Sequence, residues 1–381
     1  MKIMIIASWY PEGNQITGSF FRDRAQHLAA CGCEVNVAFA SLRVCSNNKS
    51  KGLTIQKNGG ITEYRYFKRN LTPFSERGIA WQKVRMIQEI YMNICKDSGR
   101  PDIIHLESAR CAKAAVALAQ REQIPLTYTE HYSKILNSIA GSYYNRLMRF
   151  AVNNSDYIFL ISSVMKRKLN PPAEKWAMLP NETDFSIFTP TTPPKHFTFK
   201  ALGSFSKIKG YDQLISAFAE VHKRYPNCRL VIGGYGKEEM RLKKLCKQLA
   251  LTDCVTFPGK ILLENRNAFY QNTSAFVCSS HTETFSVVII EAFACGIPVI
   301  ATECGGPEDL ITSKNGYLVK RDNIASLTQG MIKMIENRQH FNGEEIRAQA
   351  AALYDIDIII KKQIDCFNTA ISRFPNKKEE K

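Results

Sequence analysis

Two glutamates lie eight residues apart in the stretch ETFSVVIIE, residues 283–291, and the residues between them are mostly apolar. A carboxylate in an apolar setting is costly unless it meets a hydrogen-bond donor. A sugar or ribose hydroxyl would serve as that donor for Glu291. The alternative is structural: Glu283 caps a helix, and Glu291 is a buried carboxylate paired within the protein. The stretch by itself leaves both interpretations open.

The same stretch predicts an anion-binding helix end. A helix is expected over residues 286–295, and its first N–H groups have no partners within the helix. Such N–H groups can hold an anion. Lys209 precedes Gly210 in the loop after another predicted strand, where its ammonium can meet phosphate oxygens. The alternative for Lys209 is a solvated side chain beside Lys207.

Alternating strands and helices must position these groups. In the first half of the chain, buried apolar strands alternate with segments of 3.6-residue period, which predicts a parallel sheet covered on both faces. The predicted strands are residues 2–7, 34–40, 103–106, 126–129 and 157–161. The predicted helices are residues 19–30, 79–95, 112–119 and 142–153.

Residues 181–194 are rich in proline and threonine, and we interpret them as a linker. After them the predicted strands are residues 200–202, 229–233, 255–257, 275–279 and 299–301. The predicted helices are residues 210–224, 237–249, 286–295, 307–311, 323–336 and 344–373.

The pattern predicts an α/β protein of two doubly wound domains. We expect the first domain at residues 1–185, the second at 186–355, and a C-terminal helix at 356–381 that packs back on the first. Ligands of such sheets bind beyond the carboxyl ends of the strands, so the cleft between the domains is the expected active site. Glu283 follows the predicted strand 275–279 and would face that cleft.

The residues from 283 onward continue into a longer pattern, ETFSVVIIEAFACGIPVIATECGGPE. This pattern resembles the signature of retaining glycosyltransferases of the GT-B fold, family 4. ALGSF at 201–205, followed by Lys209 and Gly210, resembles the phosphate-binding segment of that family, and VIGGYG at 231–236 resembles its G-x-G turn. Looser similarities in the first half are WYP at 9–11, GSFF at 18–21, PDIIH at 101–105 and TEH at 129–131.

The resemblance implies a donor site in the second domain. Lys209 would neutralise the diphosphate of a nucleotide sugar. Glu291 would bind the ribose, and Glu283 would hold hydroxyls of the donor sugar. The backbone amides that would assist Lys209 belong to Phe285, Ser286 and Val287.

The resemblance also assigns roles to glycines and a histidine. Gly18 would let the N-terminal loop approach the donor, where a side chain would collide. Ser204 and Gly234 belong to the turns expected to bind the donor phosphates. His131 would lie across the cleft beside the sugar; its alternative is a hydrogen-bonded core histidine. The expected catalytic residues are Glu283, His131 and Lys209.

The chain departs from the family pattern at several positions. Ser204 occupies a position where the family often has arginine, which weakens the expected phosphate contact. Glu107 occupies a position where many members have a second histidine near His105. Thr284 and Ser286 replace commonly seen glycines, which is a milder change at a helix start.

Composition limits the setting of the protein. No apolar run is long enough to span a bilayer, and the short apolar start reaches Pro11 too early for a secretory leader. The 12 cysteines show no paired C-x-x-C spacing, which indicates free thiols in a reducing cytoplasm. There is no His/Asp cluster, so we expect neither a metal nor another cofactor.

The formal net charge is +16. Nucleic acid, an anionic membrane or a phosphate-bearing substrate would each fit this charge, and plain surface lysine is the alternative. A lipid-linked glycan at an anionic membrane face would suit Trp81, Lys83, Arg85 and Tyr91 on one predicted helix and Tyr143, Tyr144, Arg146 and Arg149 on another. The alternative is that these residues are ordinary helix surface and core. The expected location is therefore the cytoplasm, with peripheral contact at the inner membrane face.

These observations predict a retaining glycosyltransferase of the hexosyltransferase class, EC 2.4. We expect a UDP- or GDP-sugar donor and a sugar or lipid-linked glycan acceptor, in cell-surface polysaccharide or glycolipid synthesis. One alternative is a nucleotide-sugar epimerase of the same architecture, which would turn over the donor alone. The other is a basic, non-enzymatic nucleic-acid-binding protein, which would leave Glu283 and Glu291 unexplained. We therefore expect no nucleic-acid partner.

Overall fold

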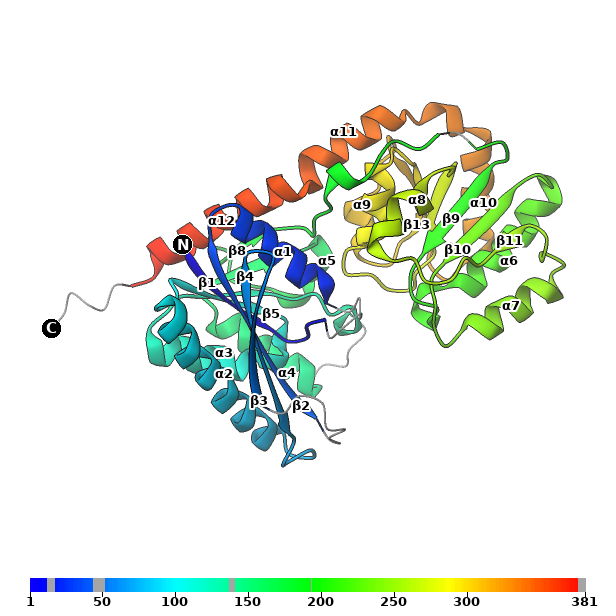
Figure 1. Ribbon diagram of the computed structural model, residues 1–381. Coiled ribbons are helices and arrows are strands. Elements are labelled where there is room, and N and C mark those ends of the chain that lie inside the picture. Colours follow the sequence, from blue (N-terminus) through cyan, green and yellow to red (C-terminus); the bar gives the residue numbers. More distant parts are fainter. Residues whose placement is uncertain (12–17, 44–51, 137–140, 193, 376–381) are drawn as a thin grey trace. The chain divides into compact units, whose positions relative to one another are not determined.

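The computed structural model describes residues 1–11, 18–43, 52–136, 141–192 and 194–375 (Figure 1). The chain forms two compact units. The first comprises Met1–Ile161, Met165–Leu179 and Ile360–Lys381, and the second comprises Ser162–Val164 and Pro180–Ile359. Each unit has its own sheet, and the two doubly wound α/β sheets that the sequence predicts are confirmed.

The sheet of the first unit has the strand order β3-β4-β2-β1-β5-β6-β7-β8. The strands are β1 (Lys2–Ala7), β2 (Glu34–Arg43), β3 (Gly52–Asn58), β4 (Ile61–Arg69), β5 (Ile103–Glu107), β6 (Leu126–Thr129), β7 (Tyr157–Leu160) and β8 (Trp176–Met178). The central strands β1 and β5 are almost wholly buried, because helices cover a parallel sheet on both faces. The strand order reverses direction between β1 and β5, which makes this the position in the sheet where ligands bind.

The hairpin of β3 and β4 is not among the elements predicted from the sequence. β3 is antiparallel to β4 and mostly exposed, so it carries no buried apolar run that would reveal it. The two-residue turn consists of Gly59 and Gly60, whose φ angles are 57° and 82°. Both angles lie in the left-handed region that glycine adopts easily and that a tight hairpin turn requires. The expectation of a parallel sheet is therefore wrong at this edge.

The helices of the first half agree with the predicted ones in type and approximate bounds. They are α1 (Ser19–Ala30), α2 (Glu76–Ser98), α3 (Ala112–Glu122), α4 (Tyr143–Asn154) and the additional short α5 (Ser163–Leu169). Helices α2, α3 and α4 lie side by side in Figure 1. Among the described helices, none is both long and apolar enough to cross a membrane.

The sheet of the second unit has the order β11-β10-β9-β12-β13-β14, and every neighbouring pair is parallel. Its strands are β9 (Thr198–Leu202), β10 (Arg229–Gly233), β11 (Val255–Thr256), β12 (Ala275–Cys278), β13 (Val299–Thr302) and β14 (Gly316–Val319). Its helices are α6 (Tyr211–Arg224), α7 (Glu239–Gln248), α8 (Arg266–Tyr270), α9 (Val287–Ala294), α10 (Ile324–Glu336) and α11 (Gly343–Tyr354). The strand order reverses between β9 and β12.

The segment interpreted as a linker, residues 181–194, packs on the second unit over its described part. The Thr191 N–H donates to the Cys295 carbonyl at 2.9 Å, and the Thr189 N–H donates to Asn267 Oδ1 at 3.0 Å. Phe185 and Phe188 are buried. The prolines and threonines therefore mark an irregular segment that is fastened to one unit.

The expected single helix at 344–373 is two helices, α11 and α12 (Ile356–Arg373). They are separated by Asp355, which has an extended conformation with φ −62° and ψ 139°. Thr183 forms a strand-like bridge to Asp355, donating to the Tyr354 carbonyl and accepting from the Ile356 N–H. Apolar periodicity continues across this break, so no local pattern in the sequence marks it.

The C-terminal part of α12 belongs to the first unit. Phe367 is completely buried there, with its ring centroid 5.4 Å from that of His105 and 5.5 Å from that of Phe159. Helix α12 thus supplies part of the core that packs against β5 and β7 of the first sheet.

We expect Phe367→Ala to lower the free energy of unfolding of the first unit by about 3–5 kcal/mol, because it leaves a cavity against two aromatic rings. Equilibrium denaturation of the full chain measures this. The neighbouring Asn368 is exposed, and Asn368→Ala is the control that should leave the transition in place. Equal transitions for both variants would contradict the packing role of α12.

Candidate active site

The carboxyl ends of β9 and β12 border a small pocket in the second unit. Its lining includes Leu202 at the end of β9, Lys209 from the following loop, and Ser279, Ser280 and Glu283 from the loop after β12. These strands flank the point where the strand order reverses, which is where doubly wound sheets bind their ligands. The pocket therefore occupies the position that the fold reserves for a ligand.

Lys209 ends a single turn of 3₁₀ helix, Lys207–Lys209, and Gly210 follows in a left-handed conformation with φ 61°. The Ser279 hydroxyl donates to the Lys209 carbonyl at 2.9 Å, which fixes the turn against the end of β12. A Cβ atom at Gly210 would overlap the Ser279 carbonyl oxygen, so only glycine allows this approach. The backbone on both sides of Lys209 is thus held in place.

The Lys209 ammonium lies 2.6 Å from Glu283 Oε1. Burial alone would lower the pKa of Lys209, but the Glu283 carboxylate outweighs burial and raises that pKa above its ordinary value. The Ser280 hydroxyl donates to the same Glu283 oxygen at 2.8 Å. The pocket therefore contains a charged lysine and a carboxylate, largely withdrawn from water and satisfied by each other.

The backbone of Glu283 is fixed by the glycine-rich turn that follows β13. Its N–H donates to the Cys304 carbonyl at 3.1 Å, and its carbonyl accepts from the Gly306 N–H at 2.8 Å. A Cβ atom at Gly306 would overlap the backbone of Phe285. The CGGPE turn at residues 304–308 thus holds the Glu283 loop in place by backbone hydrogen bonds and close packing.

Helix α9 begins directly after this loop. Phe285 is buried and packs against Tyr354, Ser286 is the N-cap residue, and Val287 is the first residue of the helix. Ser286 has φ 99° and ψ 78°, a region that residues with a side chain rarely adopt. Strain of this kind is concentrated at ligand-binding positions.

Glu291 lies inside α9 and is almost completely buried. Arg266 Nη1 donates to Glu291 Oε1, and the Tyr270 hydroxyl donates to Glu291 Oε2 at 2.8 Å. Both partners come from the short helix α8, which is not among the predicted helices. In this structure Glu291 therefore has the internal partners of the structural interpretation, and its ribose role remains a prediction.

Two glycine-rich turns cross at the end of β9 and β10. A Cβ atom at Gly234 would overlap the Gly203 carbonyl oxygen, and one at Gly236 would lie 2.4–2.9 Å from the backbone of Phe205, both far too close. The exposed Ser204 lies within this crossing, and its hydroxyl is 3.1 Å from that of Ser206. Because Gly234 has no side chain, its turn can pack closely against the loop that carries Ser204.

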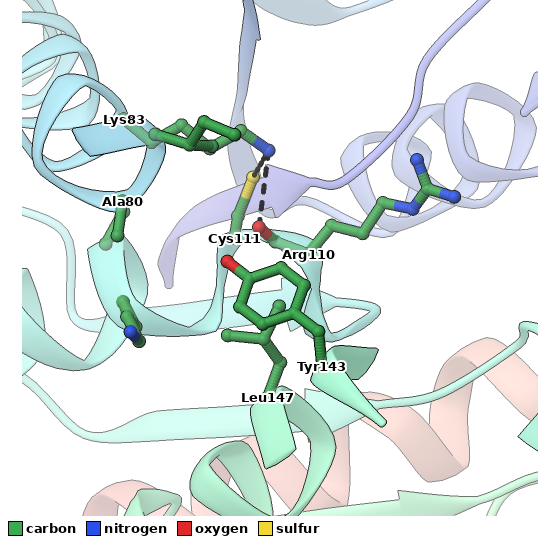
Figure 2. A pocket seen from close by; sticks show the side chains of 9 residues that line it. Ala80, Lys83, Arg110, Cys111, Tyr143 and Leu147 are labelled. Carbon is green, nitrogen blue, oxygen red and sulfur yellow. Dashed lines mark hydrogen bonds between the residues drawn. The ribbon is translucent and has the colours of Figure 1, made fainter. Parts of the chain in front are cut away.

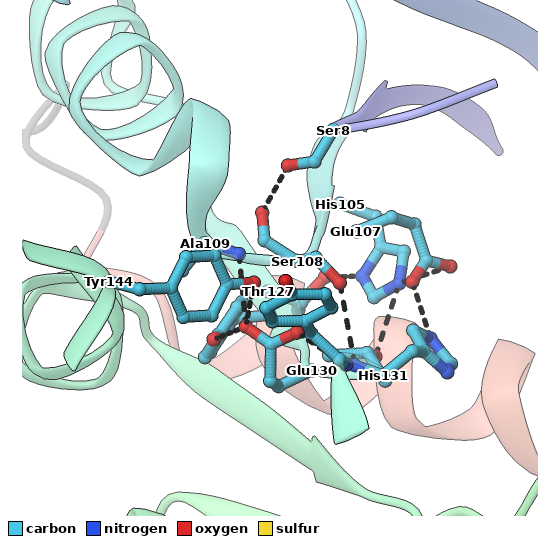
Figure 3. A network of polar contacts seen from close by, with 12 residues as sticks. Ser8, His105, Glu107, Ser108, Ala109, Thr127, Glu130, His131 and Tyr144 are labelled. Carbon is cyan, nitrogen blue, oxygen red and sulfur yellow. Dashed lines mark hydrogen bonds and ion pairs between the residues drawn. The ribbon is translucent and has the colours of Figure 1, made fainter. Parts of the chain in front are cut away.

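The first unit has its own polar cluster at the carboxyl ends of β5 and β6 (Figure 3). Glu107 lies between two histidines: its Oε2 is 2.8 Å from His131 Nε2, and its Oε1 is 3.2 Å from His105 Nε2. Burial alone would raise the pKa of Glu107, but the two histidines outweigh burial and lower it. Glu107, which takes the place of a second histidine, is thus the common partner of both imidazoles.

Glu130 forms the other half of this cluster. Its carboxylate accepts the Tyr128 hydroxyl at 2.7 Å, the Tyr144 hydroxyl at 2.9 Å and the N–H groups of Ala109, His131 and Tyr132 (Figure 3). Burial and the Glu130 charge raise the pKa of both tyrosines, which keeps them as donors. This buried carboxylate orients the loop that carries His131.

The His131 ring is nearly buried and lies edge-on to Phe20 and Phe21, at centroid distances of 5.2 and 5.3 Å. Gly18 precedes these phenylalanines with φ 82°, and a Cβ atom there would meet Trp9 Cδ1 at 3.0 Å. The GSFF segment therefore packs against the TEH segment through aromatic rings.

The structure brings together one subset of the predicted site residues. Lys209 and Glu283 are in contact, and the turn that begins α9 follows at once. Gly234 and Ser204 lie in the neighbouring glycine crossing, whereas Glu291 is engaged with α8 on the same unit. The predicted residues of the first unit, His131 and Gly18, belong to a separate cluster.

Four polar residues of these sites were not predicted as site residues: Ser280, Arg266, Tyr270 and Glu130. Ser280 is only three residues from Glu283, so its contact with that carboxylate could have been predicted from the sequence. Arg266 and Tyr270 are far from Glu291 in sequence and lie in a helix of one turn, so no pattern links them to it. Within the described residues, no group of three or more histidine, cysteine or acidic side chains is arranged to hold a metal ion.

Two doubly wound units, with a lysine–glutamate pair at the strand-order reversal of the second, have the architecture of the GT-B fold. Residues 18–186 match the family described as Glycosyltransferase Family 4, and residues 183–351 match that described as Glycosyl transferases group 1. The chain therefore belongs to the family 4 glycosyltransferases, and the resemblance seen in the sequence is confirmed.

Curated relatives agree with this assignment. An uncharacterized glycosyltransferase of Haemophilus influenzae is 33% identical over 192 residues, which is 50% of this chain and 48% of that protein. A phosphatidylinositol N-acetylglucosaminyltransferase component of Arabidopsis thaliana is 24% identical over 262 residues, which is 65% of this chain and 58% of that protein. The chain spans about half the length of the curated relatives that it matches.

Solved structures share the fold over nearly the whole chain. Sucrose-phosphate synthase from Thermosynechococcus elongatus has a TM-score of 0.81 at 20% identity, covering 98% of this chain and 100% of that one. An Anabaena protein in complex with UDP has a TM-score of 0.76 at 16% identity, covering 97% of this chain and 100% of that one. At these identities the likeness shows the GT-B fold.

We expect Gly234→Ala to disrupt the second unit, because the new Cβ atom would overlap the Gly203 carbonyl. Gly259 is a matched control: its φ is also positive, at 84°, but a Cβ atom there meets nothing within 4 Å. Gly259→Ala should cost only the backbone strain, about 1–2 kcal/mol. Thermal unfolding of the two variants separates steric overlap from strain, and equal losses would contradict the close crossing.

Ser286→Gly should stabilise the second unit by about 0.5–1 kcal/mol, because glycine adopts the left-handed conformation without strain. The control, Ser216→Gly, lies in the interior of α6 and should destabilise by a similar amount. Calorimetric melting of both variants gives the signs. A destabilising Ser286→Gly would show that the contacts of the serine side chain outweigh its strain.

Proposed function

We propose that the protein transfers a sugar from a nucleoside-diphosphate sugar to an acceptor hydroxyl. The observation that carries the proposal is the largely buried Lys209–Glu283 pair, 2.6 Å apart, at the strand-order reversal of the second sheet. A lysine in this position suits a phosphate, and a carboxylate beside it suits sugar hydroxyls. Membership in the glycosyltransferase family supports the same assignment.

In the proposed reaction, Lys209 stabilises the negative charge that develops on the departing diphosphate. The N–H groups of Phe285, Ser286 and Val287 at the start of α9 assist it, since a helix N-terminus favours an anion. The donor phosphate replaces Glu283 as the partner of the ammonium. Glu283 is then available to accept hydrogen bonds from the donor sugar near its reacting carbon.

Glu291 is proposed to bind the ribose. Its partners within the unit, Arg266 and Tyr270, orient the carboxylate from α8. In the Arg266–Glu291 pair, the arginine side chain is 21% exposed, so a nucleotide would approach the pair from the arginine side. Ser204 and Gly234 would line the phosphate side, where the serine offers a hydroxyl in place of the usual arginine.

The first unit is proposed to bind the acceptor. His131, held by Glu107, is one of its polar side chains at the carboxyl ends of β5 and β6. We propose transfer of a hexose with retention at the anomeric carbon, as the sequence resemblance implies. No metal is assigned a role, since Lys209 and the start of α9 supply the positive charge.

The names of similar proteins suggest the substrate classes. Structures of the Anabaena protein contain UDP and UDP-glucose, which supports a UDP-sugar as the first donor to test, with GDP-sugars second. The Arabidopsis relative is named as part of a phosphatidylinositol N-acetylglucosaminyltransferase. We therefore propose a sugar or lipid-linked glycan acceptor, in cell-surface polysaccharide or glycolipid synthesis at the cytoplasmic side of the membrane.

The test is nucleotide release and thermal shift with UDP-, GDP-, ADP- and CMP-sugars. We expect one nucleotide class to stabilise the protein and to be released slowly. Lys209→Gln should slow release by about a hundredfold, because one charge partner of the diphosphate is lost. Lys207→Gln, two residues earlier and exposed, is the matched control and should remain within about twofold of wild type.

Loss of a buried partner can also unfold a protein. The double variant Lys209→Gln/Glu283→Gln leaves no unpaired charge and should be folded but inactive. Release unaffected by Lys209→Gln would contradict the proposal. Turnover of the donor without nucleotide release would indicate the epimerase instead.

A further inference from the structure

The first unit carries exposed apolar side chains and many cations in residues 70–86, 109–114 and 141–150. We call this region, which spans parts of α2, α3 and α4, the α2–α4 surface. Leu71 is 72% exposed, Phe74 is fully exposed and Trp81 is 56% exposed. Three such side chains within eleven residues of chain form a concentrated apolar group. Exposed apolar groups rimmed by charge mark interaction sites.

The loop that carries Leu71 and Phe74 is anchored rather than frayed. The buried Gln82 of α2 donates to Thr72 Oγ1 at 2.9 Å and to Asn70 Oδ1 at 3.3 Å, and its Oε1 accepts the Leu71 N–H at 3.2 Å. Ser75 caps α2 by accepting the Gly78 N–H at 3.0 Å. This network holds the loop against the helix while the two apolar side chains point outward.

The same surface is strongly positive. It carries seven cations against a single carboxylate, Glu76, which gives +6 of the chain's net charge of +16. Both oxygens of Glu76 lie 3.0 Å from Arg146 Nη2, so this carboxylate is already neutralised. The seven cations are Arg77, Lys83, Arg85, Arg110, Lys113, Arg146 and Arg149.

A pocket in this surface is lined by cations and apolar groups (Figure 2). Lys83 comes from α2, Arg110 and Lys113 from the turn and helix after β5, and Tyr143 and Leu147 from α4. The Lys83 ammonium donates to the Arg110 carbonyl at 3.2 Å, which places it at the pocket. All charged residues that border this small pocket are cations, which adds to the positive charge of the surface.

We propose that the α2–α4 surface docks the protein on an anionic lipid bilayer. Leu71, Phe74 and Trp81 enter the interfacial region, and the cations contact lipid phosphates. Arg85 lies over the Trp81 ring at 4.7 Å, an aromatic–cation pair suited to the headgroup layer. A nucleic acid would account for the cations but not for a leucine and a phenylalanine held outward.

Docking bears on the acceptor side of the proposed function and rests on it there, because a lipid-linked acceptor would be met at the bilayer. The two proposals are nevertheless tested separately, since docking needs neither donor nor turnover. A protein that docks but releases no nucleotide refutes only the transferase proposal. A protein that releases nucleotide but does not dock refutes only the docking proposal.

The experiment is co-sedimentation of the full chain with vesicles of phosphatidylcholine alone or mixed with phosphatidylglycerol. Wild type should bind the anionic vesicles and lose that binding as salt is raised. Phe74→Ser/Trp81→Ser should bind about tenfold more weakly or worse, because two apolar side chains no longer enter the interface. Met240→Ser/Leu353→Ser removes two similarly exposed apolar side chains from the second unit and should bind as wild type does.

Arg110→Gln/Lys113→Gln tests the role of the cations. It should lose most of the preference for anionic vesicles, with an unchanged melting temperature as the check on folding. The proposal is overturned if wild type shows no preference for anionic vesicles, or if Phe74→Ser/Trp81→Ser binds as tightly as wild type. Binding of duplex DNA that is equally strong in wild type and in Phe74→Ser/Trp81→Ser, and that displaces the vesicles, would assign the surface to nucleic acid instead.

Discussion

The second unit depends on a simple electrostatic constraint: a lysine and a glutamate withdrawn from water must each have a partner of opposite charge. Lys209 and Glu283 satisfy one another at 2.6 Å, and the structure around them keeps them in that position. Gly210 and Ser279 fix the backbone of the lysine, while Cys304 and Gly306 fix the backbone of the glutamate. Breaking such a pair without replacing a partner costs several kcal/mol. A diphosphate would supply the lysine with another anion and so avoid that cost for the ammonium. The displaced Glu283 would keep the Ser280 hydroxyl as a donor and gain hydroxyls of the donor sugar.

The two glutamates that flank the apolar stretch have different partners. Glu283 lies at the pocket and pairs with Lys209, whereas Glu291 lies inside α9 and pairs with Arg266 and Tyr270. Their spacing places one in the loop and the other within the helix that follows it, so each carboxylate meets a cation from a different element. In the first unit Glu107 and Glu130 follow the same principle, with imidazoles, phenols and backbone N–H groups as partners. Buried carboxylates with dedicated partners are thus common to both units.

Much of the fold could be predicted from the sequence, because buried strands and amphipathic helices have periods that are visible in it. The predicted helix at residues 19–30 and the strand at 229–233 have the observed bounds. The prediction failed where the decisive contact is distant in sequence: Thr183 interrupts the helix at Asp355, and the exposed β3 pairs through its backbone. For the site, Lys209 and Glu283 could be predicted to lie at strand ends, and the structure shows them in contact. The pairing of Glu291 with a one-turn helix and the left-handed φ of Ser286 could not, since both are consequences of tertiary packing.

Lys209 is proposed to exchange Glu283 for the diphosphate of a donor, and the proposed transfer depends on that exchange. The decisive experiment is calorimetric titration of the favoured nucleoside diphosphate, beside its nucleoside, into wild type, Lys209→Gln and Glu283→Gln. We expect tighter binding of the diphosphate than of the nucleoside in wild type and a much smaller difference in Lys209→Gln, where only the N–H groups at the start of α9 remain. In Glu283→Gln the difference should be equal or larger, because the ammonium is released from its partner. Equal affinity for diphosphate and nucleoside in wild type, or an undiminished difference in Lys209→Gln, would contradict the exchange.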